Sequence, residues 1–331
     1  MIKNLLHASR NIIVLVALFV PVVHAQESAA TFPSKQVRII VPFASGSSSM
    51  EQMARLLAQK LGEKWGQSVI VENRGGGNTV IGTLAAARAT PDGYTMILVN
   101  ATFAINTVLT PNLPYDSDKD FAAVAGASAI PFLMVVHSSV PANNFREMIS
   151  LLKAGKPGEW DFATVGSTGI GRIAGETFAQ QTGVKLQHIP FKGGGEVASN
   201  LLAGNVKFTI DPPGVHVPHV RSGKLKAFAV TGPTRLVSLP DVPTFAEVGM
   251  AEYDVRTWYG LLAPSATPRP ILNKLSSSVL EVLKMPDVQE KLRAMDMSPI
   301  PPAPEQFAAM IKTEAERFAK IIKAANIKPV E

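Results

Sequence analysis

A strand, a small-residue loop and a helix follow one another directly near the N-terminus, and this succession limits the possible folds most. Residues 37–41 (VRIIV) are a short β-branched run that Pro42 stops, which predicts a strand. Apolar residues from Met50 to Leu61 recur at three- and four-residue spacing, which predicts a helix. The loop between them contains one Gly and four Ser. Such a loop opens onto a helix N-terminus, which favours an anion. A Ser-capped helix start without a ligand explains this stretch equally well.

A second unit of the same kind lies well downstream. Residues 160–164 read as a strand, residues 166–171 (GSTGIG) as a loop, and an apolar helix face follows. The loop does not match G-x-G-x-x-G, and no Gly-Lys-Ser/Thr follows it, so dinucleotide and nucleotide binding are disfavoured. Anion binding at this helix N-terminus stays open.

Strands and helices alternate along the rest of the chain. Strands are expected at 68–72, 94–99, 131–136, 185–189, 206–210, 225–230 and 256–262, and helices at 79–89, 145–153, 271–283, 287–295 and 305–325. This order predicts an α/β fold with largely parallel sheets and helices outside. The two Gly/Ser loops, roughly symmetric about the middle of the chain, suggest two similar lobes that face one ligand cleft.

The first residues indicate export. Lys3 and Arg10 precede a short apolar run at 12–23, and Val23-His24-Ala25 offers small residues at the −3 and −1 positions. We expect a signal peptide at 1–25, cleaved after Ala25, and a polar tether at 26–33. An uncleaved membrane anchor is the alternative, but the run is short for it. The expected location is the periplasm.

Charge and cysteine content exclude several classes of function. Loss of Lys3 and Arg10 with the leader lowers the formal charge from +6 to +4, which suits small anionic ligands. The basic residues are too dispersed for a nucleic-acid surface. The chain has no Cys, so disulfides, thiolate nucleophiles and Cys metal sites are excluded.

Catalytic and metal-binding patterns are incomplete. Ser150-Leu-Leu-Lys153 matches S-x-x-K, but the Lys-Thr-Gly and Ser-Asp-Asn partners are missing, and no Gly-x-Ser-x-Gly elbow occurs. Asp211, His216 and His219 could form a metal set, although neighbouring prolines break the helix that would aim both imidazoles together. We therefore expect no catalytic residue, no metal and no cofactor.

Three charged side chains remain as candidates for ligand contact. Asp211 ends a predicted strand and could accept a hydrogen bond from a ligand amine or hydroxyl, or it could cap a turn. Lys192 and Arg172 could meet a carboxylate, or could be solvated surface. Arg172 lies in the first turn of its helix, where a cation opposes the helix dipole and a bound anion would offset that cost.

Several segments resemble the tripartite tricarboxylate transporter receptor family, also called the Bug family, over essentially the whole mature chain. These are FPSKQVRIIVPF at 32–43, ARLLAQKL at 54–61, VENRGG at 71–76, PDGYT at 91–95, LPYD at 113–116, KDF at 119–121, HIPFKG at 188–193, GKL at 223–225, LPDVPT at 239–244, GLLAP at 260–264 and PEQF at 304–307. The resemblance implies a periplasmic binding protein-like fold whose two lobes close on a small carboxylate. It also implies that two β–α loops hold the carboxylate through backbone groups and water.

The chain departs from the family pattern at its candidate site. The family's first loop runs Gly-Gly with an Asp shortly after, and that Asp falls here on Met50 or Glu51. In the second loop a usual Ser falls near Gly169 and a usual His on Arg172; the usual Tyr of Pro-Tyr-Lys-Gly is Phe191. We hypothesise that Arg172 binds or balances an additional acidic group of the ligand.

The sequence thus predicts a monomeric, non-enzymatic solute-binding receptor that delivers a small organic carboxylate to a membrane transporter or sensor, without nucleic acid. An exported α/β hydrolase is the alternative, and it requires a nucleophile beside a base. The expected lobes are 34–129 with 254–331, and 130–253. The expected ligand-binding residues are Phe43, Ala44, Ser45, Gly46, Ser47, Ser48, Ser49, Asn100, Thr102, Gly166, Ser167, Thr168, Gly169, Arg172, Phe191, Lys192 and Asp211.

Overall fold

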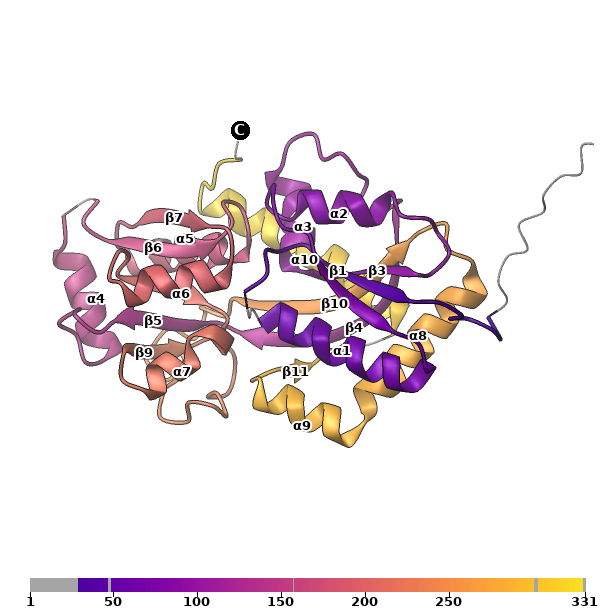
Figure 1. The fold of residues 1–331 in the computed structure, drawn as a ribbon. Coiled ribbons are helices and arrows are strands. Elements are labelled where there is room, and N and C mark those ends of the chain that lie inside the picture. The colour runs from indigo at the N-terminus through magenta and orange to yellow at the C-terminus, as the bar shows by residue number, and fades with distance from the viewer. Residues whose placement is uncertain (1–28, 47–48, 157, 301–302, 330–331) are drawn as a thin grey trace, which may run out of the picture.

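The computed structural model describes residues 29–46, 49–156, 158–300 and 303–329 and divides them between two α/β lobes (Figure 1). The predicted leader at 1–25, the start of the tether and two loop serines, Ser47 and Ser48, lie outside the described residues. Within the described ranges, no helix combines the length and apolarity needed to cross a membrane.

The first lobe is built on a six-stranded sheet with the order β11-β4-β10-β3-β1-β2. Helices from the N-terminal and C-terminal parts of the chain cover it, and the C-terminal helix packs on β4 and α3 (Figure 1). Its elements are β1 (Val37–Val41), α1 (Ser49–Trp65), β2 (Val69–Asn73), α2 (Val80–Ala87), β3 (Thr95–Asn100), α3 (Ala101–Leu109), β4 (Phe121–Pro131), β10 (Arg256–Pro264), α8 (Arg269–Lys284), α9 (Pro286–Ala294), β11 (Ser298–Pro299) and α10 (Pro304–Ala324).

The second lobe is built on a five-stranded sheet with the order β7-β6-β8-β5-β9. Its elements are β5 (Leu133–His137), α4 (Phe145–Ala154), β6 (Asp161–Val165), α5 (Ile170–Thr182), β7 (Gln187–Phe191), α6 (Gly194–Leu202), β8 (Phe208–Asp211), the 3-10 turn η1 (Pro213–Val215), α7 (Val217–Arg221) and β9 (Leu225–Val230). The chain first passes from the first sheet to the second at Phe132, which lies between the end of β4 and the start of β5. The lobe boundaries at 129/130 and 253/254 stay a prediction.

Both sheets are mixed, which corrects the expectation of largely parallel sheets. β1 pairs in parallel with β2 and β3, and β6 with β7 and β8. The strands around the two passages between the lobes pair antiparallel: β10 with β3 and β4, and β5 with β8 and β9. The reason is topological, because a strand that returns from the other lobe enters its sheet from the opposite end.

Two elements beside the cleft were not predicted. β4 contains six Ala or Gly residues among eleven, which is a weak strand signal, and burial against β10 stabilises it. α3 begins directly after β3, and the Asn100 side chain caps it by accepting a hydrogen bond from the Thr102 amide at 3.0 Å. Three short elements, η1, α7 and β11, were not predicted either, and the strands and helices that were expected lie within a few residues of their predicted positions.

The C-terminal helix α10 attaches to the first sheet through one apolar face. Phe307, Phe318 and Ile322 are buried, and Ile311 and Ala325 pack against the same core. The Phe307 ring meets Trp258 of β10 edge to face, with ring centroids 5.4 Å apart. It also fills the space above Gly260, where a β-carbon would lie 2.0 Å from a ring atom.

We expect Phe307→Ala to lower the free energy of unfolding by about 3–5 kcal/mol, because the side chain is fully buried and leaves a cavity. Urea denaturation followed by circular dichroism measures this loss. Gln306→Ala, an exposed neighbour on the same helix, is the matched control and should stay within about 0.5 kcal/mol of the wild type. Equal effects of the two substitutions would contradict the packing described here.

Candidate ligand-binding cleft

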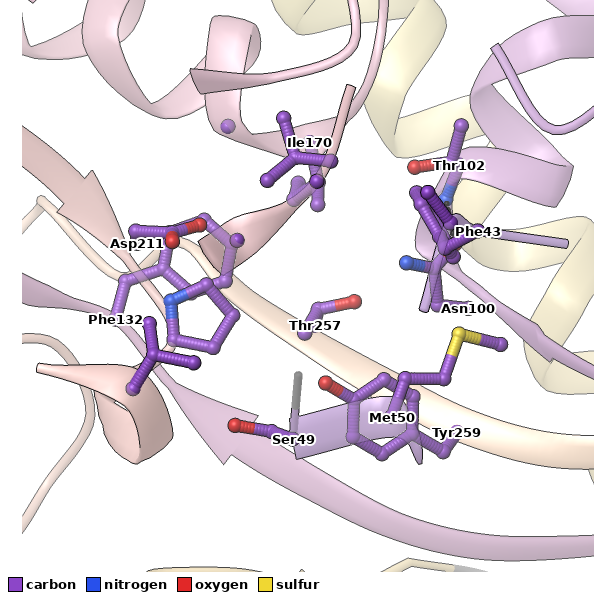
Figure 2. A pocket seen from close by; sticks show the side chains of 17 residues that line it. Phe43, Ser49, Met50, Asn100, Thr102, Phe132, Ile170, Asp211, Thr257 and Tyr259 are labelled. Atoms are coloured by element: carbon purple, nitrogen blue, oxygen red, sulfur yellow. Dashed lines mark hydrogen bonds between the residues drawn. The ribbon is translucent and has the colours of Figure 1, made fainter. Parts of the chain in front are cut away.

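A cleft of about 680 Å³, its open mouth included, lies between the lobes. In Figure 2, Asp211 and Phe132 face Asn100 and Thr102 across it, and Tyr259 and Ser49 lie below. The lining residues are Phe43, Ala44, Ser49, Met50, Asn100, Thr102, Phe132, Val165, Ile170, Gly171, Gly193, Gly194, Asp211, Pro212, Val215, Thr257 and Tyr259.

Four helices begin at the cleft wall. Ser49 opens α1, Asn100 caps α3, Ile170 opens α5 and Gly194 opens α6, and all four residues line the cleft. The caps of α5 and α6 are glycines without a side-chain cap, so no side chain occupies their first amides. Helix N-termini carry unpaired N–H groups and partial positive charge, so these walls attract an anion.

Among the described residues, the lining contains no Lys, Arg or His side chain, and Asp211 is its single acidic group. Positive potential in the cleft therefore comes from backbone dipoles instead of formal charges. Backbone N–H groups can bind a carboxylate through hydrogen bonds. The part of the cleft beside Asp211 suits a ligand group that donates a hydrogen bond.

The first loop contributes Phe43, Ala44 and Ser49 to the lining. The buried Ser49 hydroxyl has no hydrogen-bond partner among the described residues. Ser45 and Gly46 lie outside the lining. Instead, the Gly46 amide donates to the buried carboxylate of Glu51 at 3.0 Å, and Arg55 binds the other carboxylate oxygen at 2.5 Å. Glu51 thus holds the loop from inside the protein.

The second loop lies behind the lining and is held by contacts of its own. Val165, Ile170 and Gly171 reach the cleft, while residues 166–169 are not among its lining residues. The Gly166 amide donates to the Phe191 carbonyl at 2.9 Å, and the Thr168 hydroxyl accepts a hydrogen bond from Asn78 of the first lobe. The loop therefore shapes one wall without presenting its serine and threonine side chains to the lining.

Arg172 is placed beside the second loop and outside the lining. Its guanidinium donates to the Ser167 carbonyl at 3.1 Å and to the Lys328 carbonyl at 3.4 Å, and it lies 3.8 Å from the Glu176 carboxylate. These contacts tie the loop to the C-terminal segment. Its predicted role toward a ligand acid stays a prediction.

Two residues of the Pro-Phe-Lys-Gly segment that were expected to bind the ligand do not line the cleft. Phe191 and Lys192 are not among the lining residues, and Lys192 is exposed. The Lys192 amide donates to Glu196 at 2.9 Å. The glycines that follow, Gly193 and Gly194, line the cleft instead, at the start of α6.

Asp211 reaches the cleft from the end of β8, as its position in the sequence suggested. It is 6 % exposed, and its Oδ2 lies 3.2 Å from Nε2 of the fully buried His216. Burial, and then the charge of Asp211, raise the pKa of the Tyr259 hydroxyl. Tyr259 therefore stays neutral, so its hydroxyl can donate a hydrogen bond.

Sequence reasoning missed Phe132, Thr257 and Tyr259. Thr257 and Tyr259 alternate along β10, and Phe132 lies between β4 and β5, so all three occupy the passages between the lobes. Only the alternation along residues 256–262 could have indicated that one side of this strand faces the cleft.

Among the described residues, Thr164 pairs with His188 and Ser139 with His137, and none of these four residues lines the cleft. Thr164 donates its single hydroxyl proton to the Gly166 carbonyl at 3.0 Å, so it accepts the 2.5 Å hydrogen bond from His188 Nε2. His216 pairs with Asp211. Within the described ranges, no three His, Cys, Asp or Glu side chains could jointly hold a metal ion.

Comparisons with known proteins agree with this geometry. The model of the tripartite tricarboxylate transporter family receptor matches residues 53–327. Protein BugT of Bordetella pertussis is 33 % identical over 92 % of this chain and 93 % of its own. A protein of R. palustris solved with adipate has a TM-score of 0.86 at 30 % identity, covering 90 % of this chain and 100 % of that one. MatC of Rhodopseudomonas palustris, solved with bound malate, has a TM-score of 0.81 at 30 % identity, covering 88 % and 100 %.

We expect His188 to titrate with a pKa of about 4, because burial, and secondarily the charge of Arg172, disfavour the imidazolium. The stability that this group contributes is complete above its ordinary pKa of 6.5 and is lost as the pH falls toward about 4. NMR titration of the imidazole measures the pKa directly. Arg172→Gln should raise it, and a His188 pKa at or above 6.5 in the wild type would refute this environment.

Proposed function

Because this chain belongs to the tripartite tricarboxylate transporter receptor family, we propose that it is a periplasmic receptor that closes around a small organic carboxylate. The observation that carries the proposal is the convergence of four helix N-termini on a cleft whose described lining residues include no basic side chain. The relatives solved with adipate and malate support a carboxylate ligand.

The ligand carboxylate is proposed to bind at the starts of α5 and α6. Their glycine caps leave the first amides without a side-chain partner, and Gly171, Gly193 and Gly194 line the cleft there. Each helix N-terminus contributes about 0.3–1 kcal/mol to anion binding, and up to about 2 kcal/mol in partly buried geometry. The unpaired Ser49 hydroxyl adds a donor from the opposite lobe.

The opposite end of the ligand is proposed to carry a hydrogen-bond donor, such as a hydroxyl or an ammonium group. Asp211 is the only acidic group among the described residues of the lining, and a second ligand carboxylate close to it would be repelled. A ligand hydroxyl or ammonium group would instead give the buried carboxylate a favourable partner. His216 holds Asp211 from behind, so its position does not depend on the ligand.

Delivery to a membrane transporter completes the proposed function. We propose export to the periplasm with cleavage after Ala25, hinge closure of the lobes around the ligand, and presentation of the closed form to membrane subunits. The receptor acts as a monomer and binds no nucleic acid in this proposal. Catalysis is not part of it, because the hydroxyl–imidazole pairs Thr164–His188 and Ser139–His137 lie outside the cleft lining and His216 pairs with Asp211.

A carboxylate at one hundred times its dissociation constant should stabilise the protein by about 2.7 kcal/mol, seen as a rise in Tm of several degrees. We expect such a rise in a thermal-shift screen of carboxylates on protein stripped by refolding, and Asp211→Asn should weaken hydroxy and amino acids selectively. Asp241→Asn, an exposed aspartate of the second lobe, is the control and should change nothing. A rise in Tm with neutral or cationic compounds only would contradict the proposed anion site.

Arg172→Ala distinguishes the two roles open to this residue. If Arg172 binds an extra acidic group, the variant should lose affinity for dicarboxylates and keep it for monocarboxylates. If it only holds the Ser167 carbonyl, both classes should weaken by the same factor. Calorimetric titration with a matched pair, such as butyrate and succinate, measures the difference; unchanged affinity for both would remove Arg172 from the site altogether.

A further inference from the structure

A side-chain hydrogen bond between the lobes lies beside the cleft, in addition to those of Arg172 with Lys328, Gln180 with Ala324 and Ser238 with Asp296. The amide of Asn78, in the turn before α2, donates to the hydroxyl of Thr168 in the second loop. Thr168 is 2 % exposed, so this contact is shielded from water. The two residues are 90 positions apart in the sequence, and they belong to the lobes that a hinge motion would separate.

The first lobe holds Asn78 ready for this contact. The fully buried Asn106 of α3 accepts from the Asn78 amide at 2.8 Å, and its own amide donates to the Asn78 carbonyl at 2.9 Å. Asn106 also donates to the Thr79 hydroxyl at 3.1 Å. Asn78 and Thr79 have φ values of 51° and 76°, and a β-branched residue rarely adopts such a value. The network therefore maintains an uncommon backbone turn that points Asn78 at the other lobe.

The second lobe leaves room for Asn78 by carrying a glycine. A β-carbon on Gly166 would lie 2.3 Å from the Asn78 Oδ1 atom. Gly166 also has φ +77°, which suits glycine. A residue with a side chain at this place would push the lobes apart, so the close approach depends on both partners.

We propose that Asn78 is a positioning residue that fastens the second loop to the first lobe when the cleft closes. The bond forms only when the lobes meet, so its free energy adds to closure and raises ligand affinity without contact to the ligand. The inference rests on the proposed receptor function for its use, but the contact itself concerns the protein alone. The ligand then need not supply all of the free energy of closure.

The test measures the distance between the lobes in the absence of ligand. The chain has no Cys, so a pair of spin labels can be attached without removing native cysteines. The labels are placed at Arg88→Cys, at the end of α2, and at Lys153→Cys on α4, and both positions are exposed. Thr168→Val removes the accepting hydroxyl, and Asn78→Gly removes the amide while keeping the left-handed turn. Thr168→Ser restores the hydroxyl. Thr110→Val is the matched control, because it removes a 3.3 Å hydrogen bond to Asn106 inside the first lobe.

We expect Thr168→Val and Asn78→Gly to lower the ratio of short to long interlobe distances by about 2- to 12-fold, as loss of one hydrogen bond implies. Thr168→Ser and Thr110→Val should keep the wild-type distribution. Unchanged distances in both Thr168→Val and Asn78→Gly would overturn the proposal. Addition of succinate, malate or adipate to the wild type tests the receptor function separately. A wild type whose interlobe distances never shorten with these ligands would refute that function. The comparison of ligand-free variants would still decide the role of Asn78.

Discussion

The unpaired amides at helix N-termini govern how this molecule can work. Four helices begin at the cleft, and two of them, α5 and α6, start from glycine caps that offer no side chain in place of a ligand. A buried N–H without a partner costs free energy, so this arrangement favours an occupant with acceptor oxygens. Because the potential comes from backbone, it is fixed by the fold of both lobes and cannot rearrange as a flexible lysine could.

Internal charges are kept away from these amides. Glu51 is buried behind the first loop with Arg55, and Arg172 lies behind the second with Glu176 and two backbone carbonyls. Each ionised side chain therefore has a partner within its own lobe and need not be neutralised by the ligand. Asp211 is different, since its carboxylate is paired with a histidine and also lines the cleft. In the proposed function, this asymmetry assigns to Asp211 the discrimination among carboxylates of similar size.

Local sequence patterns predicted most strands and helices, but not β4 or the antiparallel pairing of the strands that cross between the lobes. The β-branched run at 37–41 and the apolar spacing from Met50 fixed the first strand and helix, because both depend on neighbours in the chain. β4 escaped prediction because its Ala-rich sequence becomes a strand only against β10. Thr257 and Tyr259 were not predicted as site residues for the same reason. The mixed sheets arise because the chain passes between the lobes, which no local sequence pattern indicates.

The positions of individual side chains were predictable only where the backbone fixes them. Asp211 was identified because a strand end aims its last residue toward the β–α loops. Lys192 was expected in the cleft, but its side chain is exposed and only the glycines after it reach the wall. Long side chains on loops choose among several partners, so their targets depend on tertiary contacts such as the Ser167 carbonyl for Arg172. A receptor built on backbone amides loses little by this, since its anion site is specified by where helices start.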